Sequence, residues 1–410
     1  MTITNGLVAG ATAAASSGPE HVEVPVAYDA ILLTSFGGPE GQDDVIPFLR
    51  NVTGGRGIPE ERLEEVAHHY RAFGGISPIN AQNRELKAAL EAELAERGID
   101  LPVIWGNRNW APYTHEAVAE AHERGFTKLL AIGTSAYSSY SSCRQYREDY
   151  AGALAKTGLE GVVQIDKVRQ FFDHPGFVAP FIDGVTQGLA DAAAAGFTPE
   201  QTHVLFATHS IPSTDAAKSG PAERGFGPGG AYEAQHLAVA EVVMEAALSS
   251  SASTGALPDA DLSTGDEAAT VAPTPWSLVY QSRSGPPSMP WLEPDINDAM
   301  RDLAAAGTKA FVIVPLGFVS DHMEVKWDLD TEALETAEEL GTFAVRVPTP
   351  GVHPAYVTGL IDLVMERVQG TPTAERPALT DLGPWYDVCR PGCCENVRLG
   401  FKPALAGLAP

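Results

Sequence analysis

Residues 204–212 have the sequence Val204-Leu205-Phe206-Ala207-Thr208-His209-Ser210-Ile211-Pro212, an apolar run that ends in a histidine, a serine and a proline. An unbroken apolar run of this length is typical of a strand that is buried on both faces of a parallel sheet. Open α/β sheets bind their ligands at the carboxyl ends of such strands. The run therefore predicts that His209 lies at a functional edge.

A second segment places a carboxylate in a similar setting: Gly317-Phe318-Val319-Ser320-Asp321-His322-Met323-Glu324. A histidine and a glutamate that face each other across a cleft can exchange protons and hold a divalent metal. A histidine at a strand end can also be an ordinary hydrogen-bonded core residue, but the His-Ser-x-Pro context and the partner segment favour a site.

Two further acidic residues follow Glu324 at spacings of four, Asp328 and Glu332. On a helix all three carboxylates share one face. Such a face is either simply solvated or forms a track that guides cations toward Glu324 and protons away from it.

Apolar strand-like runs alternate with amphipathic helical segments along most of the chain, which predicts an α/β protein with parallel sheets covered by helices. The strand-like runs fall at residues 30–35, 101–106, 128–132, 202–207, 277–281, 309–314 and 342–347. The recurrence indicates two similar lobes with the site between them. The expected divisions are a flexible tail at 1–27, lobes at 28–190 and 191–370, a mobile insertion at 249–275, and a cysteine-bearing tail at 371–410.

The composition excludes several classes of function. Lys and Arg number 27 against 53 Asp and Glu, a net charge of −26, which disfavours binding to nucleic acid or to anionic lipid. No apolar run reaches the roughly 18–20 residues of a membrane-spanning helix, and no signal peptide is recognisable. We expect a cytoplasmic monomer with no stable membrane association.

The chain has only four cysteines, and three of them lie within six residues: Cys143, Cys389, Cys393 and Cys394. In a reducing compartment this bunching favours a metal or iron–sulfur site over disulfides.

Two hydroxyl-bearing segments could serve a ligand with carboxylate arms. The turn Gly74-Gly75-Ile76-Ser77-Pro78 permits close approach to a ligand, although it could be a plain turn. Residues 137–146, rich in Tyr and Ser, follow the third strand-like run and could equally be a structural loop.

Taken in order along the chain, these segments resemble the ferrochelatase family, whose members insert ferrous iron into a porphyrin. The resemblance covers about residues 31–367. The motifs that carry it are Phe36-Gly37-Gly38-Pro39-Glu40, Pro47-Phe48-Leu49-Arg50, Gly74–Pro78, Thr208–Pro212, Trp291–Ile296 and Gly317–Glu324 with its continuation to Glu332.

The resemblance implies the chelatase fold, with two Rossmann-like lobes and a porphyrin in the cleft between them. It assigns the metal-site pair to His209 and Glu324, and an acidic ridge to Asp328 and Glu332. The porphyrin contacts that it implies are Phe36, Arg56, Ser77 and Tyr146. Cys143 and the C-terminal trio match the ligands of a [2Fe–2S] cluster in cluster-bearing members, and adjacent cysteines leave Zn²⁺ as an alternative.

Cysteine-bearing tails of this kind resemble those of actinobacterial members, which act on coproporphyrin III. The chain departs from the family in its propionate contacts, because Arg56 stands alone where relatives have several arginines and His69 occupies another arginine position. Protoporphyrin IX is therefore the alternative substrate. The rival functions are non-catalytic binding of a tetrapyrrole and chelation of cobalt or nickel.

Overall fold

In a computed structural model of the chain, the structure describes residues 20–54, 58–254, 274–285, 288–395, 400 and 402–407. The side chains of residues 250–254 are not described. Four predictions fall wholly or partly outside this range: the contact at Arg56, the tail at residues 1–27, the insertion at residues 249–275, and the C-terminal tail at residues 371–410.

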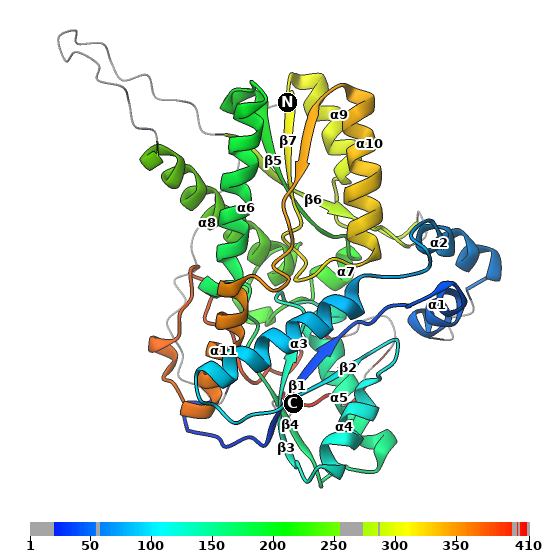
Figure 1. The fold of residues 1–410 in the computed structure, drawn as a ribbon, viewed down its shortest axis with the longest axis vertical. Helices are drawn as coiled ribbons and strands as arrows, with labels where there is room; N and C mark the ends of the chain where they lie inside the picture. The colour runs from blue at the N-terminus through cyan, green and yellow to red at the C-terminus, as the bar shows by residue number, and fades with distance from the viewer. Residues whose placement is uncertain are drawn as a thin grey trace, which may run out of the picture.

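The described residues form two four-stranded sheets in which every pairing is parallel, one in each lobe (Figure 1). The first contains β1 (Ala30–Ser35), β2 (Val103–Asn107), β3 (Lys128–Gly133) and β4 (Gln164–Lys167) in the order β2-β1-β3-β4. The second contains β5 (Thr202–His209), β6 (Trp276–Gln281), β7 (Ala310–Val314) and β8 (Phe343–Arg346) in the order β6-β5-β7-β8. The lobes thus repeat one topology, as predicted.

The chain order reverses at the first strand of each sheet, since β1 pairs with both β2 and β3, and β5 pairs with both β6 and β7. Such a reversal opens a crevice at the carboxyl ends of the strands. His209 is the last residue of β5, and Phe36 directly follows β1. The two lobes therefore both contribute residues that follow a strand at a reversal point.

Helices cover both faces of each sheet. Those of the first lobe are α1 (Val45–Thr53), α2 (Glu60–Ala72), α3 (Ile79–Glu96), α4 (Thr114–Glu123) and α5 (Gln145–Thr157), with the short η1 (Gln42–Asp44) and η2 (Tyr140–Arg144). Those that follow are α6 (Pro175–Ala194), α7 (Ser213–Ala216), α8 (Gly230–Thr254), α9 (Ile296–Ala306), α10 (Leu334–Leu340) and α11 (Pro354–Gln369), with η3 (Pro199–Gln201), η4 (Ala222–Arg224), η5 (Val325–Ala333) and η6 (Thr373–Glu375).

The alternation of side chains along the strands explains the layering. In β1, Ile31 and Leu33 point into the largest apolar core, whereas Ala30 and Leu32 point into a smaller core beneath α4 and α5. The largest core also contains Phe206 of β5, so it runs continuously from one lobe to the other. Helix α11 packs against both α3 and α6, which joins the lobes further.

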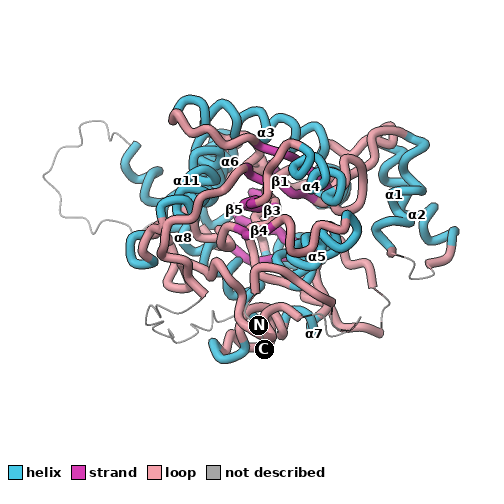
Figure 2. Tube along the Cα trace, turned by 90° about the horizontal axis from the view of Figure 1, so that it is seen from below, coloured by secondary structure: helices cyan, strands magenta, loops and turns pink. Residues whose placement is uncertain are grey.

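The helix pair α1 and α2 extends from the side of the molecule beside the junction of the lobes, as Figures 1 and 2 show. Helix α6, which the predicted boundary at residues 190 and 191 would assign to the first lobe, packs against β5, β7 and β8. No helix in the described parts of the chain is long and apolar enough to cross a bilayer.

Candidate functional site

A cavity of about 330 Å³ lies between the lobes, within the range of about 300–1,000 Å³ found for ligand pockets. Its wall from the first lobe includes the apolar side chains of Phe36, Phe48 and Tyr70. Its wall from the second lobe includes His209 and the segment from Gly317 to Glu324. The cavity therefore combines an apolar side with titratable groups.

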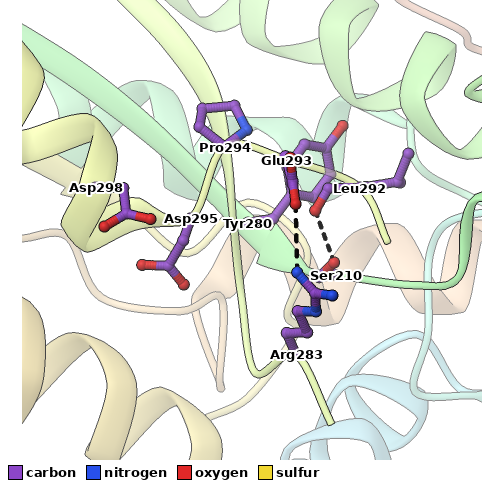
Figure 3. Close-up of a pocket in the computed structure, with 8 residues that line it drawn as sticks. All are labelled: Ser210, Tyr280, Arg283, Leu292, Glu293, Pro294, Asp295 and Asp298. Carbon is purple, nitrogen blue, oxygen red and sulfur yellow. Dashed lines mark hydrogen bonds and ion pairs between the residues drawn. The ribbon is translucent and has the colours of Figure 1, made fainter. Parts of the chain in front are cut away.

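The His-Ser-x-Pro segment is held in place by the Trp291–Ile296 motif. The backbone of Pro212 pairs antiparallel with Trp291, and the Ser210 hydroxyl donates to the Leu292 carbonyl oxygen at 2.8 Å. Figure 3 shows this bond beside the ion pair of Arg283 with Glu293. The separate cavity drawn there is lined by Ser210 but by neither His209 nor Glu324. The Trp291–Ile296 motif thus positions the backbone that follows β5.

His209 and Glu324 approach each other across the second lobe, with 3.6 Å between Nε2 and Oε2. The Nδ1 atom of His209 contacts the Ser210 carbonyl oxygen. Because a carbonyl oxygen only accepts, Nδ1 keeps its proton and Nε2 is the atom that exchanges one. Both side chains border the open cavity, with exposed fractions of 31% for His209 and 47% for Glu324.

The pKa values of His209 and Glu324 shift in opposite directions from their ordinary values. Burial acts to lower the pKa of His209, but the attraction and hydrogen bond of Glu324 outweigh it and raise the pKa to about 9. Burial acts to raise the pKa of Glu324, but the attraction of His209 outweighs it and lowers the pKa to about 2. At neutral pH the pair is therefore an imidazolium beside a carboxylate. His322 is a third member, with Nδ1 at 3.9 Å from the Glu324 carboxylate.

Glu324 directly precedes η5, which is a π-helical segment rather than the predicted α-helix. Arg346 of β8 ties this segment down through Asp330, at 2.6 Å, and through Asp321, at 3.2 Å. Gln281 at the end of β6 donates to the Glu324 carbonyl oxygen at 3.1 Å. Glu324 is therefore placed by contacts from two strands of the second sheet.

Asp328 and Glu332 do not line the cavity. Asp328 contacts the Ser282 hydroxyl, and Glu332 accepts from Trp327 Nε1 at 2.8 Å. Burial raises the pKa of Asp328 to about 7, and the nearby charges of Glu324 and Glu332 add to the rise. The three predicted carboxylates thus interact electrostatically, although only Glu324 borders the cavity.

The first-lobe lining of the cavity also includes several serines and a largely buried cation, Arg108, that sequence reasoning missed. Arg108 pairs with Asp149 at 2.5 Å and stacks over the Tyr146 ring, with 4.4 Å from its guanidinium carbon to the ring centroid. Its buried Nη2 has no partner among the described residues. Ser77 lines the same cavity, and its close approach to Gly38 leaves no room there for a side chain.

The structure brings five of the predicted site residues to one cavity: Phe36, Ser77, Tyr146, His209 and Glu324. Arg56 lies outside the described residues. A signal for Arg108 was present, because it directly follows β2 as His209 ends β5, at the carboxyl end of a parallel strand. The predicted strand at residues 101–106 indicated this position, but no functional residue was predicted there.

The four cysteines lie together in a separate buried cluster. All four are free thiols, and the Sγ atoms of Cys393 and Cys394 are 3.7 Å apart. Cys143 comes from η2, beside the serines that line the cavity, and the Cys394 sulfur accepts from the backbone N–H of Gly220 at 3.1 Å. The C-terminal tail thus meets both lobes at this cluster.

Across the described residues, no three His, Cys, Asp or Glu side chains are arranged to hold a single metal ion. The donor set itself consists of four thiols with no disulfide, which is the ligand set of a [2Fe–2S] cluster. Hydrogen bonds among the thiols lower the pKa values of Cys389 and Cys394 and raise those of Cys143 and Cys393. Two of the four are thus favoured as thiolates, the ligating form, and the buried set of four free thiols fits such a group.

Comparison with known proteins agrees with this geometry. The sequence profile named Ferrochelatase matches residues 28–368. A coproporphyrin III ferrochelatase of Leifsonia xyli subsp. xyli is 67% identical over 98% of this chain and 100% of its own length. Proteins of the same name from Tropheryma whipplei (strain Twist) and Streptomyces griseus subsp. griseus are 57% and 50% identical, over 93% of this chain in both cases and over 93% and 97% of their own lengths.

Among solved structures, SirB from Bacillus subtilis with Fe³⁺ aligns with a TM-score of 0.45 at 11% identity, over 86% of this chain and 100% of that chain. The profile match spans both lobes and includes His209 and Glu324, and the similar sequences extend over nearly the whole chain. The chain belongs to the ferrochelatase family.

Proposed function

We propose that this protein inserts Fe²⁺ into coproporphyrin III, releasing two protons and giving the iron porphyrin of haem biosynthesis. The observation that carries the proposal is the imidazolium–carboxylate pair of His209 and Glu324 at one wall of an apolar cavity between the lobes. The names of the relatives support the choice of substrate.

The chemistry follows from the two charged atoms. Fe²⁺ binds to the pair and displaces the proton on His209 Nε2, since imidazole and carboxylate are both suitable ligands for this metal. As Fe²⁺ moves onto the ring nitrogens, the freed Nε2 and the Glu324 carboxylate take the protons that leave the ring. Asp328, with a pKa of about 7, is the next acceptor on the way to solvent.

The apolar wall around Phe36 and Tyr70 receives the flat face of the macrocycle. A cavity that fits a bent ring better than a flat one speeds metallation, because bending exposes the nitrogen lone pairs. On the first-lobe lining, the propionate groups meet the Ser77 hydroxyl, the Tyr146 hydroxyl and the unpartnered Nη2 of Arg108. A guanidinium is the side chain best suited to hold a carboxylate.

The test is metallation by a His209→Ala variant, followed anaerobically through the change in porphyrin absorption. Loss of a general acid–base group predicts a fall in turnover of about 100-fold or more. His203→Ala is the matched control, because His203 also lies on β5 but bonds to Ser277 outside the cavity. A folded His209→Ala variant with near-normal turnover would refute the assignment.

Comparing coproporphyrin III with protoporphyrin IX in the same assay tests the substrate. A kcat/KM that favours protoporphyrin IX would replace the proposed substrate and leave the metal chemistry intact. Binding of either porphyrin without any metallation would support the non-catalytic alternative.

We propose further that Cys143, Cys389, Cys393 and Cys394 hold a [2Fe–2S] cluster. When bound, such a group supplies a rigid cross-link and a one-electron redox centre. The buried set of four free thiols supports this assignment. Iron and sulfide analysis of anaerobically purified protein tests it, and a stoichiometric zinc content without sulfide would contradict it. The expected cytoplasmic location and monomeric state are tested by cell fractionation and by light scattering.

A further inference from the structure

Two buried cations beside the cysteine cluster have no carboxylate partner among the described residues. Arg147 of α5 donates from Nε to the Leu405 carbonyl oxygen at 2.6 Å, and its buried Nη1 has no partner there. Lys167 of β4 donates to the carbonyl oxygens of Val168 at 3.1 Å and Tyr386 at 3.4 Å. Both are nearly inaccessible, with exposed fractions of 4% for Arg147 and 5% for Lys167.

The other buried cations of the described chain are all paired. The buried Lys and Arg residues are Arg144, Arg147, Lys167, Arg169, Arg367 and Arg376. The ion pairs are Arg144 with Glu148, Arg169 with Glu366, Arg367 with Asp166, and Arg376 with Asp387. Burying a charge without a counter-charge is costly. Arg147 and Lys167 are therefore expected to have an anion nearby.

The contacts of both cations lead to Cys389. The backbone N–H of Cys389 donates to the Ala406 carbonyl oxygen, and Cys389 forms a β-bridge with Gly407. Cys389 therefore lies beside the stretch of the tail that contains Leu405, whose carbonyl oxygen accepts from Arg147. A side chain at Gly407 would collide with Arg147 Nη2, which shows how closely the guanidinium packs there. Lys167 reaches the same part of the tail, because the Tyr386 carbonyl oxygen to which it donates lies three residues before Cys389.

The electrostatics agree with this placement. The positive charges of Lys167 and Arg147 both act on the Cys389 sulfur, so both cations lie within electrostatic range of the cluster. Arg147 in the first turn of α5 lies four residues after Cys143 of η2, so two adjoining segments carry a proposed ligand and a cation. Positive charge therefore reaches the cluster from both α5 and β4.

We propose that Arg147 and Lys167 are the built-in counter-charge for an anionic iron–sulfur cluster held by the four cysteines. This inference rests on the cluster assignment made above. A [2Fe–2S] group with four thiolates is formally a dianion when oxidised and a trianion after reduction by one electron. Buried cations stabilise both states and the reduced state more, so they set the reduction potential of the cluster.

The experiment uses full-length protein reconstituted anaerobically, with the cluster reduced by dithionite and followed by visible absorption and electron paramagnetic resonance. Arg147→Gln and Lys167→Met remove charge, whereas Arg147→Lys and Lys167→Arg keep it. We expect the charge-removing variants to shift the midpoint potential to more negative values and the charge-keeping variants to stay close to the wild type. Lys218→Met is the matched control, because Lys218 is exposed beside the cluster and solvent screens its charge.

A second readout separates counter-charge from simple packing. In the protein without its cluster, removing an unpaired buried charge should raise or preserve the thermal unfolding temperature. With the cluster bound, the same substitution should lower it and speed loss of the cluster. Loss of the Leu405 contact alone would lower stability in both forms.

The outcomes are distinct. An unchanged midpoint potential in both charge-removing variants overturns the counter-charge role while leaving the cluster in place. Failure of the wild type to assemble any cluster overturns the cluster assignment and this inference with it. Metallation by the wild type, measured in parallel, tells whether the proposed enzymatic function stands independently.

Discussion

The opposed pKa values of His209 and Glu324 determine how the pair responds to pH. The raised pKa of His209 means that its attraction to Glu324 stabilises the fold fully below about pH 6.5, its unfolded value, and that this contribution is lost as the pH rises through about 9. Glu324, with a pKa of about 2, stays ionised across this range. Metal affinity is expected to change in the opposite direction and to rise with pH, because a divalent ion competes with the proton on His209 Nε2.

We therefore expect the affinity of the porphyrin-free protein for Co²⁺ or Zn²⁺, used as stable substitutes for Fe²⁺, to increase about tenfold per pH unit between pH 7 and about 9. Isothermal titration calorimetry in two buffers of different ionisation enthalpy would detect the release of one proton. His209→Ala should abolish the dependence. A wild-type affinity that is flat over this range would mean that Nε2 is not a ligand.

Arg108 is expected to bind a propionate group through its unpartnered Nη2. Arg108→Lys keeps a charge beside Asp149 but loses the second donor and the stack on Tyr146. A charged hydrogen bond contributes about 1.5–3 kcal/mol, so KM for coproporphyrin III should rise at least about 10-fold with little change in kcat. Steady-state kinetics check this, and Arg124→Lys on the exposed face of α4 is the control. A fall in kcat alone would assign Arg108 to another role.

At the level of single residues, sequence patterns could predict the positions with a local signature. His209 and Glu324 each end a recognisable motif, and the structure places them 3.6 Å apart. Arg108 was missed because its one signal, a place near the end of the predicted strand at residues 101–106, comes with no motif that sets it apart from other residues at strand ends. Only the parallel pairing of β1 with β2 brings it beside Tyr146.

Among the elements, η5 shows what periodicity cannot predict. Carboxylates four residues apart fit an α-helical face, but the segment forms π-type bonds over Val325–Ala333. Arg346 of β8 pairs with Asp330 inside the segment and with Asp321 before it, and the periodicity of the segment does not reveal these contacts. Two elements of the first lobe, β4 and α5, were also not predicted. Strand β4 was missed because it spans only Gln164–Lys167 and lacks an apolar run.

Replacing Arg346 with Met should leave the mostly buried Asp321 without an ion-pair partner and Asp330 with Lys326 alone, and destabilise the protein by about 3 kcal/mol. Turnover should fall as well, because the helix that follows Glu324 loses its anchor. Urea unfolding followed by tryptophan fluorescence measures the first effect. The exposed pair of Arg301 with Asp298 provides the control, since Arg301→Met should cost about 0.5 kcal/mol or less. Equal losses in the two variants would contradict the anchoring role.

A stacking contact joins α2 to η5 across the two lobes. The rings of His69 and Trp327 are nearly parallel, with 4.1 Å between centroids, and Phe73 meets the same indole edge-on. Such contacts contribute about 0.5–1.5 kcal/mol each. Trp327→Ala should therefore speed hydrogen exchange of the α2 amides by roughly 2–10-fold, measured by mass spectrometry. Unchanged exchange in α2 would show that other contacts hold this helix.

For the whole molecule, the repeated strand–helix order was enough to predict two similar parallel sheets. It could not predict that Phe206 of one sheet and Leu33 of the other share a continuous core, because that depends on how α3, α6 and α11 pack together. The bunched cysteines predicted a metal or cluster site. The contacts of Cys394 with Lys218 and Gly220 of the second lobe could not be predicted, since no sequence pattern relates residues 218–220 to the C-terminal cysteines.

The C-terminal segment is held at two separate places, which allows a prediction for the entire chain. Before the cysteines, Trp385 is fully buried and Asp387 pairs with Arg376 at 2.7 Å. From Cys389 onward, the tail is held by the cysteine cluster, by the ion pairs of Arg390 with Glu20 and Glu223, and by hydrogen bonds from Arg144 and Arg147 to the Lys402 and Leu405 carbonyl oxygens. Cys143→Ser removes the one cysteine of the four that lies in the first lobe, so the proposed cluster could no longer tie the tail to that lobe. Hydrogen exchange should then increase across residues 389–407 and stay slow across residues 376–388. Loosening of both stretches together would mean that the cluster holds the whole segment, and no change in either would show that it does not hold the tail.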